Sequence, residues 1–145
     1  MEKRPLRIGI TCYPVYGGSG VVATELGLEL AQRGHEVHFI TYAQPFRLPF
    51  FVENVYYHEV EIPSYPLFDY PPYSLALAAA MHDTAVRREL DLLHVHYAVP
   101  HATSAWIARE MLQPQEIRVV TTLHGTDITL VGQDPSFHSI TRFSI

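Results

Sequence analysis

A run of four small residues, Gly17-Gly18-Ser19-Gly20, constrains the fold of this chain more than any other stretch. It follows an apolar segment, residues 8–12, and directly precedes a helical pattern over residues 21–33. A strand, a glycine-rich turn and a helix in this order bring bare backbone amides and the positive end of a helix to one point. Anions bind at such points, so the sequence predicts a phosphate or carboxylate site at the top of a sheet.

The rest of the chain reads as one α/β domain. Its 145 residues, 48% of them hydrophobic, are enough to bury a core. Strands are expected at residues 6–12, 36–42, 55–62, 92–96 and 117–123, and helices at residues 21–33, 74–90 and 100–112. This alternation predicts βαβ units with right-handed crossovers, and therefore a Rossmann-like, doubly wound parallel sheet.

Composition bears on partners and location. The net charge of −5 and the scattered Lys and Arg residues argue against a nucleic-acid partner. The single cysteine, Cys12, is incompatible with an internal disulfide and is typical of a reducing compartment. No apolar segment is long enough to cross a membrane. We therefore expect a cytoplasmic protein with no membrane partner, and the sequence leaves homo-oligomerisation open.

The glycine run has a second interpretation as a dinucleotide site. Residues 18–23 match the Rossmann glycine pattern, with Ala23 in the third glycine's place. However, residues 13–16 separate the strand from the glycines, and Thr41 and Tyr42 stand where an acidic residue is expected. The pattern thus favours a simple anion site, with a nicotinamide-dependent dehydrogenase as an alternative.

Three histidines follow the later strands. His94 and His96 are two apart on one strand, so their side chains point to the same side, and His124 follows the next strand. One alternative is a metal-dependent hydrolase that uses His94, His96 and His124; the other is that one or both of His94 and His96 are buried and hydrogen-bonded. Asp127 is the only clear carboxylate nearby, so no metal is expected, and Asp127 is assigned to capping rather than catalysis.

Several joined motifs resemble those of a known family. They are residues 8–10 before the glycine run, residues 30–37, residues 91–96 and residues 121–127. This combination is similar to the N-terminal domain of retaining glycosyltransferases with the GT-B fold, in glycosyltransferase family 4. Further motifs, at residues 9–14, 45–48, 70–73, 94–101 and 123–129, resemble the branch of that family that acts in bacillithiol biosynthesis.

The resemblance implies a fold, a domain and a reaction. Residues 1–145 would be the N-terminal, acceptor-binding half of a GT-B fold, and a C-terminal nucleotide-sugar domain would lie outside this chain. The chain stops inside a helical pattern, residues 141–145, which fits a piece of a longer protein. The implied reaction transfers N-acetylglucosamine from UDP-N-acetylglucosamine to L-malate, without metal or cofactor, and this piece alone is expected to be inactive. An inositol phosphate or a lipid-linked sugar is the alternative acceptor.

The resemblance also assigns roles to residues. Gly17 and Gly18 would approach the donor diphosphate, and His124, the catalytic candidate, would contact the transferring sugar. Hydroxyl groups and a guanidinium suit a small dianion such as malate. The acceptor-binding candidates are Ser19, Tyr97, Thr122 and Arg142.

Overall fold

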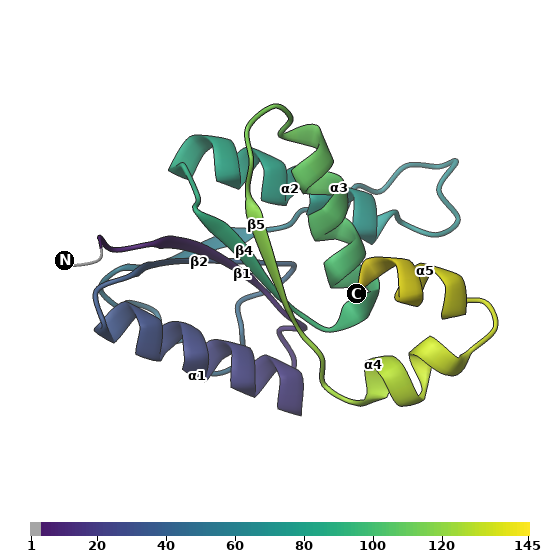
Figure 1. The fold of residues 1–145 in the computed structure, drawn as a ribbon, viewed down its shortest axis with the longest axis horizontal. Coiled ribbons are helices and arrows are strands. Elements are labelled where there is room, and N and C mark those ends of the chain that lie inside the picture. The colour runs from purple at the N-terminus through teal and green to yellow at the C-terminus, as the bar shows by residue number, and fades with distance from the viewer. Residues whose placement is uncertain (1–3) are drawn as a thin grey trace.

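Five parallel strands form the central sheet of the structure, a computed structural model that describes residues 4–145 (Figure 1). The strands are β1 (Arg7–Thr11), β2 (Glu36–Thr41), β3 (Val55–Glu59), β4 (Leu92–His96) and β5 (Arg118–Thr122). Their order in the sheet is β3-β2-β1-β4-β5. The predicted doubly wound, Rossmann-like parallel sheet is confirmed.

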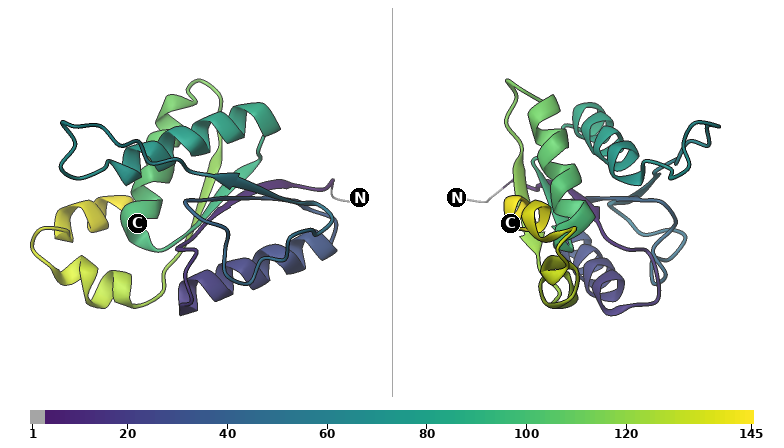
Figure 2. Two further views of the ribbon diagram at one scale, coloured as in Figure 1. Left: turned by 180° about the vertical axis from the view of Figure 1, so that it is seen from behind. Right: turned by 90° about the vertical axis from the view of Figure 1, so that its right-hand side faces the viewer.

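Helices cover both faces of this sheet (Figures 1 and 2). Helix α1 (Gly18–Gln32) packs on one face, and α2 (Tyr73–Arg88) and α3 (Thr103–Met111) pack side by side on the other. After β5 come two short helices, α4 (Thr126–Thr129) and α5 (His138–Ser144). A short π-helical turn, η1 (Ala98–Ala102), and a 3₁₀ helix, η2 (Val131–Gln133), complete the elements.

Two predicted helix starts differ from the structure. Helix α1 begins at Gly18, so most of the glycine run is the first turn of the helix and not a loop before it. The α-helix α3 begins at Thr103, because residues 98–102 form the π-helical turn η1 before it. No helix among residues 4–145 is long and apolar enough to cross a membrane.

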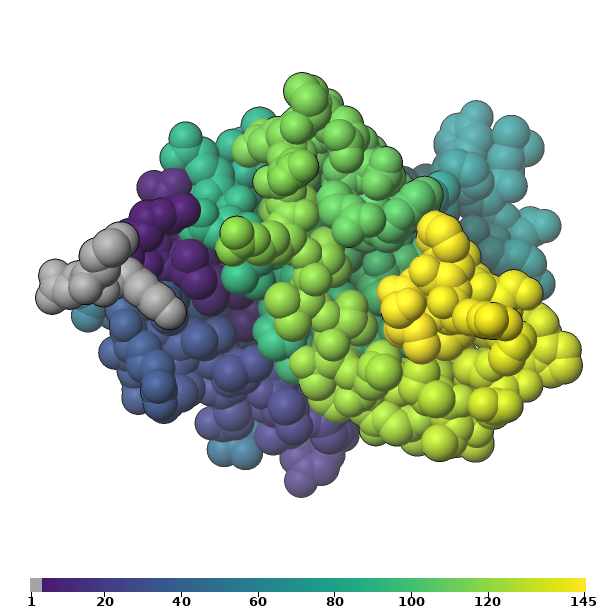
Figure 3. Space-filling view, in the orientation of Figure 1, coloured from purple at the N-terminus to yellow at the C-terminus, as the bar shows by residue number. Residues whose placement is uncertain are grey.

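The core lies on both faces of the sheet because side chains alternate along each strand. On β2, Val37 and Phe39 pack in the cluster under α1, whereas Ile40 packs in the cluster under α2 and α3. This packing makes the sheet a firm base for the loops that leave its strands. The residues after β5 form a continuous lobe at one end of the molecule (Figure 3).

The strand order places the sheet's topological switch between β1 and β4. Thr11 pairs with Val95 across these strands, and His96 pairs with Thr122 across β4 and β5. The loops after β1, β4 and β5 therefore leave from three neighbouring strand ends. We call this edge the carboxyl rim; in folds of this kind ligands bind there.

Candidate functional site

The first feature of the carboxyl rim is the start of α1. The first helical hydrogen bond runs from the Val21 amide to the Gly17 carbonyl, at 3.0 Å. The amides of residues 18–20 precede that bond and have no partner inside the helix. Gly17 stands at the N-cap position, where no side chain caps the helix. The amides and the positive end of α1 are thus available to an anion.

The glycines of the run do not share one explanation. A Cβ on Gly20 would lie 2.4 Å from the Tyr13 carbonyl oxygen and 2.8 Å from that of Val15, so close packing requires glycine there. A Cβ on Gly18 would meet nothing within 4 Å, and one on Gly17 only the Val15 side chain at 3.9 Å. Packing thus accounts for Gly20 but not for Gly17 or Gly18, which border open space.

Ser19 and Tyr97, two of the acceptor-binding candidates, line one cavity. Its volume is about 500 Å³, and its lining residues are Tyr13, Val15, Ser19, Ser74, Tyr97, Val99, Pro100, Val131 and Phe137. We call it the hydroxyl cavity, because its polar side chains are hydroxyls and none of its lining residues is charged. Sequence reasoning missed Tyr13 and Ser74. The place of Tyr13 just after β1 was an available signal; Ser74, after an irregular proline-rich loop, offered none.

Tyr97 is held in an uncommon backbone conformation. Its φ of 91° lies where residues other than glycine are rarely found. The Tyr97 amide donates to the Thr122 carbonyl at 2.9 Å, and its hydroxyl lies 2.9 Å from Oγ1 of Thr126. Its ring also packs edge-on against Tyr13, with centroids 5.4 Å apart. Backbone strain that neighbours hold in place is typical of functional sites.

The predicted orientation of the histidine pair is confirmed. The rings of His94 and His96 stack with centroids 4.6 Å apart. Nε2 of His94 lies 2.7 Å from Oγ1 of Thr122, and Nδ1 of His96 lies 3.0 Å from Nε2 of His124. Burial lowers the pKa of both His94 and His96, the latter to about 3. The structure thus joins Thr122 and His124 to the stacked pair of His94 and His96.

This arrangement does not favour the hydrolase alternative. Among residues 4–145, no three His, Cys, Asp or Glu side chains are placed to hold a metal ion. One nitrogen of each ring of the cluster faces another histidine or Thr122 instead of a shared central point.

Asp127 has a different role from the expected helix cap. It is fully buried, and its two carboxylate oxygens accept hydrogen bonds from the amides of His124, at 3.1 Å, and Ala98, at 3.0 Å. Helix α4 has Gly125 at its N-cap, at a φ of 97°, and no side-chain cap bond. The carboxylate therefore ties the loop after β4 to the loop after β5.

Arg142, the remaining acceptor-binding candidate, lies elsewhere. It is on α5 and lines a separate cavity of about 180 Å³ together with His138 and Thr141. The structure does not bring it to the hydroxyl cavity with Ser19 and Tyr97.

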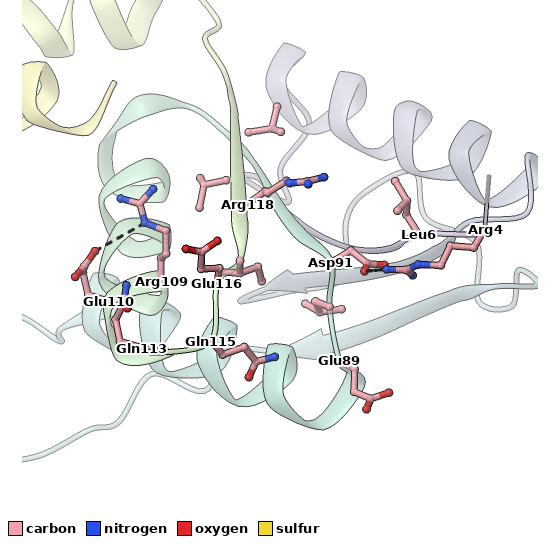
Figure 4. Close-up of a pocket in the computed structure, with 14 residues that line it drawn as sticks. Arg4, Leu6, Glu89, Asp91, Arg109, Glu110, Gln113, Gln115, Glu116 and Arg118 are labelled. Carbon is pink, nitrogen blue, oxygen red and sulfur yellow. Dashed lines mark hydrogen bonds and ion pairs between the residues drawn. The ribbon is translucent and has the colours of Figure 1, made fainter. Parts of the chain in front are cut away.

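A cavity larger than the hydroxyl cavity lies at the opposite end of the strands (Figure 4). It measures about 980 Å³ and is lined by side chains of both charges. Figure 4 shows Arg4 against Asp91, a contact of 2.5 Å, and Arg109 turned toward Glu110, at 3.8 Å. These charges compensate one another, and ligands of doubly wound sheets bind at the other end of the strands. We therefore assign the functional site to the carboxyl rim.

Comparison with known proteins places these features in context. Residues 16–145 match the sequence model of the family described as Glycosyltransferase Family 4. N-acetyl-alpha-D-glucosaminyl L-malate synthase from Bacillus anthracis is 59% identical over 140 residues, which are 97% of this chain and 36% of that protein. This chain thus spans little more than a third of the curated relative's length.

A solved structure supports the fold. Sucrose-phosphate synthase from Thermosynechococcus elongatus superposes with a TM-score of 0.63 at 16% sequence identity. The match covers 96% of this chain and 40% of that one. At this identity the likeness concerns the fold alone, and it supports the Rossmann-like parallel sheet.

Proposed function

This chain belongs to glycosyltransferase family 4, and we propose that the protein it comes from transfers N-acetylglucosamine from UDP-N-acetylglucosamine to L-malate. The observation that carries the proposal is the 59% identity to a malate synthase over 97% of the chain. We further propose that residues 1–145 are the acceptor-binding domain, and that a C-terminal domain beyond them holds most of the nucleotide. The proposed location is the cytoplasm, in keeping with the single thiol, which is buried.

The donor diphosphate is assigned to the start of α1. The amides of residues 18–20 have no helical partners, and a Cβ at Gly18 would meet nothing within 4 Å. The Gly17 amide donates to the Val15 carbonyl at 2.8 Å, so Gly17 would contribute open space beside the phosphate and not its own N–H. The positive end of the helix adds a favourable field for the two negative charges. This combination supports Gly17 and Gly18 as the phosphate-binding residues.

The acceptor is assigned to the hydroxyl cavity and its surroundings. Ser19 and Tyr97 line that cavity. Thr122 is adjacent, because its carbonyl accepts a hydrogen bond from the Tyr97 amide. The cavity offers hydrogen bonds but no positive charge, whereas malate is a dianion. In the proposal, the amides of α1 supply part of the compensation. Arg142 would have to reach malate from its separate cavity on α5 to supply the rest.

The proposed transfer needs no cofactor. The bond between the sugar's anomeric carbon and the diphosphate oxygen breaks, and a bond to the malate hydroxyl oxygen forms on the same face. The malate hydroxyl proton passes to the leaving diphosphate oxygen, so atoms and charge balance. His124 contacts the transferring sugar. Positioning and charge stabilisation would then supply most of the rate.

The test is an assay of the full-length protein with UDP-N-acetylglucosamine and a panel of acceptors. We expect L-malate to be glycosylated, and D-malate and inositol phosphate not to be. Ser19→Ala should raise KM for malate, and His124→Ala should lower kcat. Ser136→Ala is the matched control, because Ser136 is an exposed serine whose hydroxyl bonds to Asp134. If malate is not glycosylated, the proposal fails; turnover of inositol phosphate instead would establish the alternative acceptor.

A further inference from the structure

One ring nitrogen at the centre of the carboxyl rim is unpaired. Nε2 of His96 is buried and has no hydrogen-bond partner within residues 4–145. Most buried polar side-chain atoms in proteins have such a partner, so an exception calls for an explanation. The other nitrogen of the ring, Nδ1, lies 3.0 Å from Nε2 of His124. Together these observations indicate where the two rings carry their protons.

A neutral imidazole carries one proton, on either nitrogen. If His96 carried it on Nε2, a buried N–H would lack an acceptor. If His96 carries it on Nδ1, the unpaired group is only a lone pair, and the N–H donates to Nε2 of His124. Buried N–H groups without an acceptor are rarer in proteins than acceptors without a donor. The second arrangement is therefore favoured, and His124 must then carry its own proton on Nδ1.

The two stacked rings, His94 and His96, stay neutral at ordinary pH, as the argument requires of His96. The pKa of His96 is lowered to about 3, mainly by burial and then by the neighbouring rings of His94, His124 and His101. Burial lowers the pKa of His94 as well. Stacked at 4.6 Å, the rings of His94 and His96 would repel each other if both were charged.

We propose that His96 is a positioning residue that holds His124 as the tautomer protonated on Nδ1. His124 is half-buried at the rim, and its Nδ1 is not the nitrogen that faces His96. It therefore offers a ligand a hydrogen-bond donor there and not a lone pair. The catalytic consequence rests on the proposed function, in which His124 contacts the transferring sugar. A donor suits a sugar hydroxyl or a phosphate oxygen, whereas a bare nitrogen would repel the latter.

The direct test is spectroscopic. In the full-length protein with ¹⁵N-labelled histidine, ring-nitrogen shifts distinguish a protonated nitrogen from a bare one. We expect His124 to be protonated on Nδ1, and His96→Leu to shift it toward the other tautomer. In His96→Asn the side-chain amide keeps an N–H near the original Nδ1 position and should preserve the wild-type signal. His38→Leu is the control, since His38 is equally buried but bonds to His58 and Glu36.

The kinetic test separates positioning from mere packing. His96→Leu should lower kcat about ten- to a hundredfold, the range found when the partner that orients a metal-binding histidine is removed. His96→Asn should recover part of this loss, and KM for malate should change little in both variants.

A wild-type His124 protonated on Nε2 would overturn the inference, as would an unchanged His124 signal in His96→Leu. The wild-type spectrum decides even if the leucine variant does not fold. If the wild-type protein fails to glycosylate malate, the proposed function falls while the spectra still test the role of His96.

Discussion

Asp127 shows how one side chain organises the carboxyl rim. Its carboxylate accepts hydrogen bonds from the amides of both Ala98 and His124, and the residue is fully buried. In Asp127→Asn the side-chain NH₂ would face one of these amides, leaving a buried donor without an acceptor. We expect a loss of about 1–3 kcal/mol in unfolding free energy, measured by urea titration.

The control for this change is Asp83→Asn. Asp83 lies on α2 with 62% of its side chain exposed and bonds to the adjacent His82. An exposed pair of this kind contributes little, so the control should stay within about 0.5 kcal/mol of the wild type. Equal stability of the two variants would contradict the role given to Asp127.

Single residues also mark the limit of sequence reasoning. The side shared by His94 and His96 follows from the period of a strand and was predictable. Their partners Thr122 and His124 depend on the register of β4 against β5, which pairs residues 26 positions apart, such as His96 and Thr122. No local pattern encodes that register. The hydrogen bond between His96 and His124 therefore could not be predicted from the sequence, and neither could the separation of Arg142 from Ser19.

At the scale of elements, α1 provides a matched pair of glycines. Gly18→Ala adds a methyl group in open space and at a helical position, so stability should stay equal or rise slightly. Gly20→Ala places a methyl group 2.4 Å from the Tyr13 carbonyl oxygen, so stability should fall by at least about 1 kcal/mol. Thermal unfolding of both variants measures this difference.

The same pair tests the donor site. If the α1 amides hold the diphosphate, Gly18→Ala should raise KM for UDP-N-acetylglucosamine without loss of stability. The new methyl group would hinder the approach of the diphosphate to these amides. An unchanged KM in a folded Gly18→Ala protein would count against the phosphate assignment.

Element boundaries were predictable where composition changes sharply. β4 spans Leu92–His96 as expected, because an apolar run there is bounded by Asp91 and the loop at Tyr97. The predicted start of α1 was too late, because glycine is a poor helix former and the glycine run was expected to be a loop. In the structure, the close packing of Gly20 outweighs this low propensity. Helix α4, of four residues, is too short to leave a clear helical period in the sequence, whereas the helical pattern over residues 141–145 does coincide with α5.

For the molecule as a whole, buried histidines predict sensitivity to acid. Burial lowers the pKa of His96 to about 3 and that of His58 and His101 to about 4, from 6.5. As pH falls below 6.5, the unfolded chain takes up protons that the folded chain does not. Stability should therefore be full above that pH and fall steadily toward about pH 4.

The fully buried His96 and His101 each contribute at most about 1.4 kcal/mol per pH unit to this slope. Urea unfolding at pH 7, 6 and 5 measures it, and His96→Asn should make it shallower. A stability that is flat between pH 7 and pH 5 would contradict the neutral, buried state of these rings.

The isolated 145-residue chain is a test of domain organisation. Under the proposed function one wall of the active-site cleft lies beyond these residues, so the chain alone should show no transfer from UDP-N-acetylglucosamine to malate. A sensitive mass-spectrometric assay, with the full-length protein as the positive control, measures this. Turnover by the isolated chain would place both substrates within it and refute the two-domain proposal.

The outermost position of β5 has a practical consequence. Within residues 4–145 no strand pairs with its outer side, and Val120 and Leu123 are each 45% exposed there. Unpaired backbone amides and carbonyls beside apolar side chains form a template with which a strand of another copy can pair. At high concentration, the isolated 145-residue chain should aggregate through this edge strand. Val120→Lys, which places a charge on the edge, should reduce that aggregation.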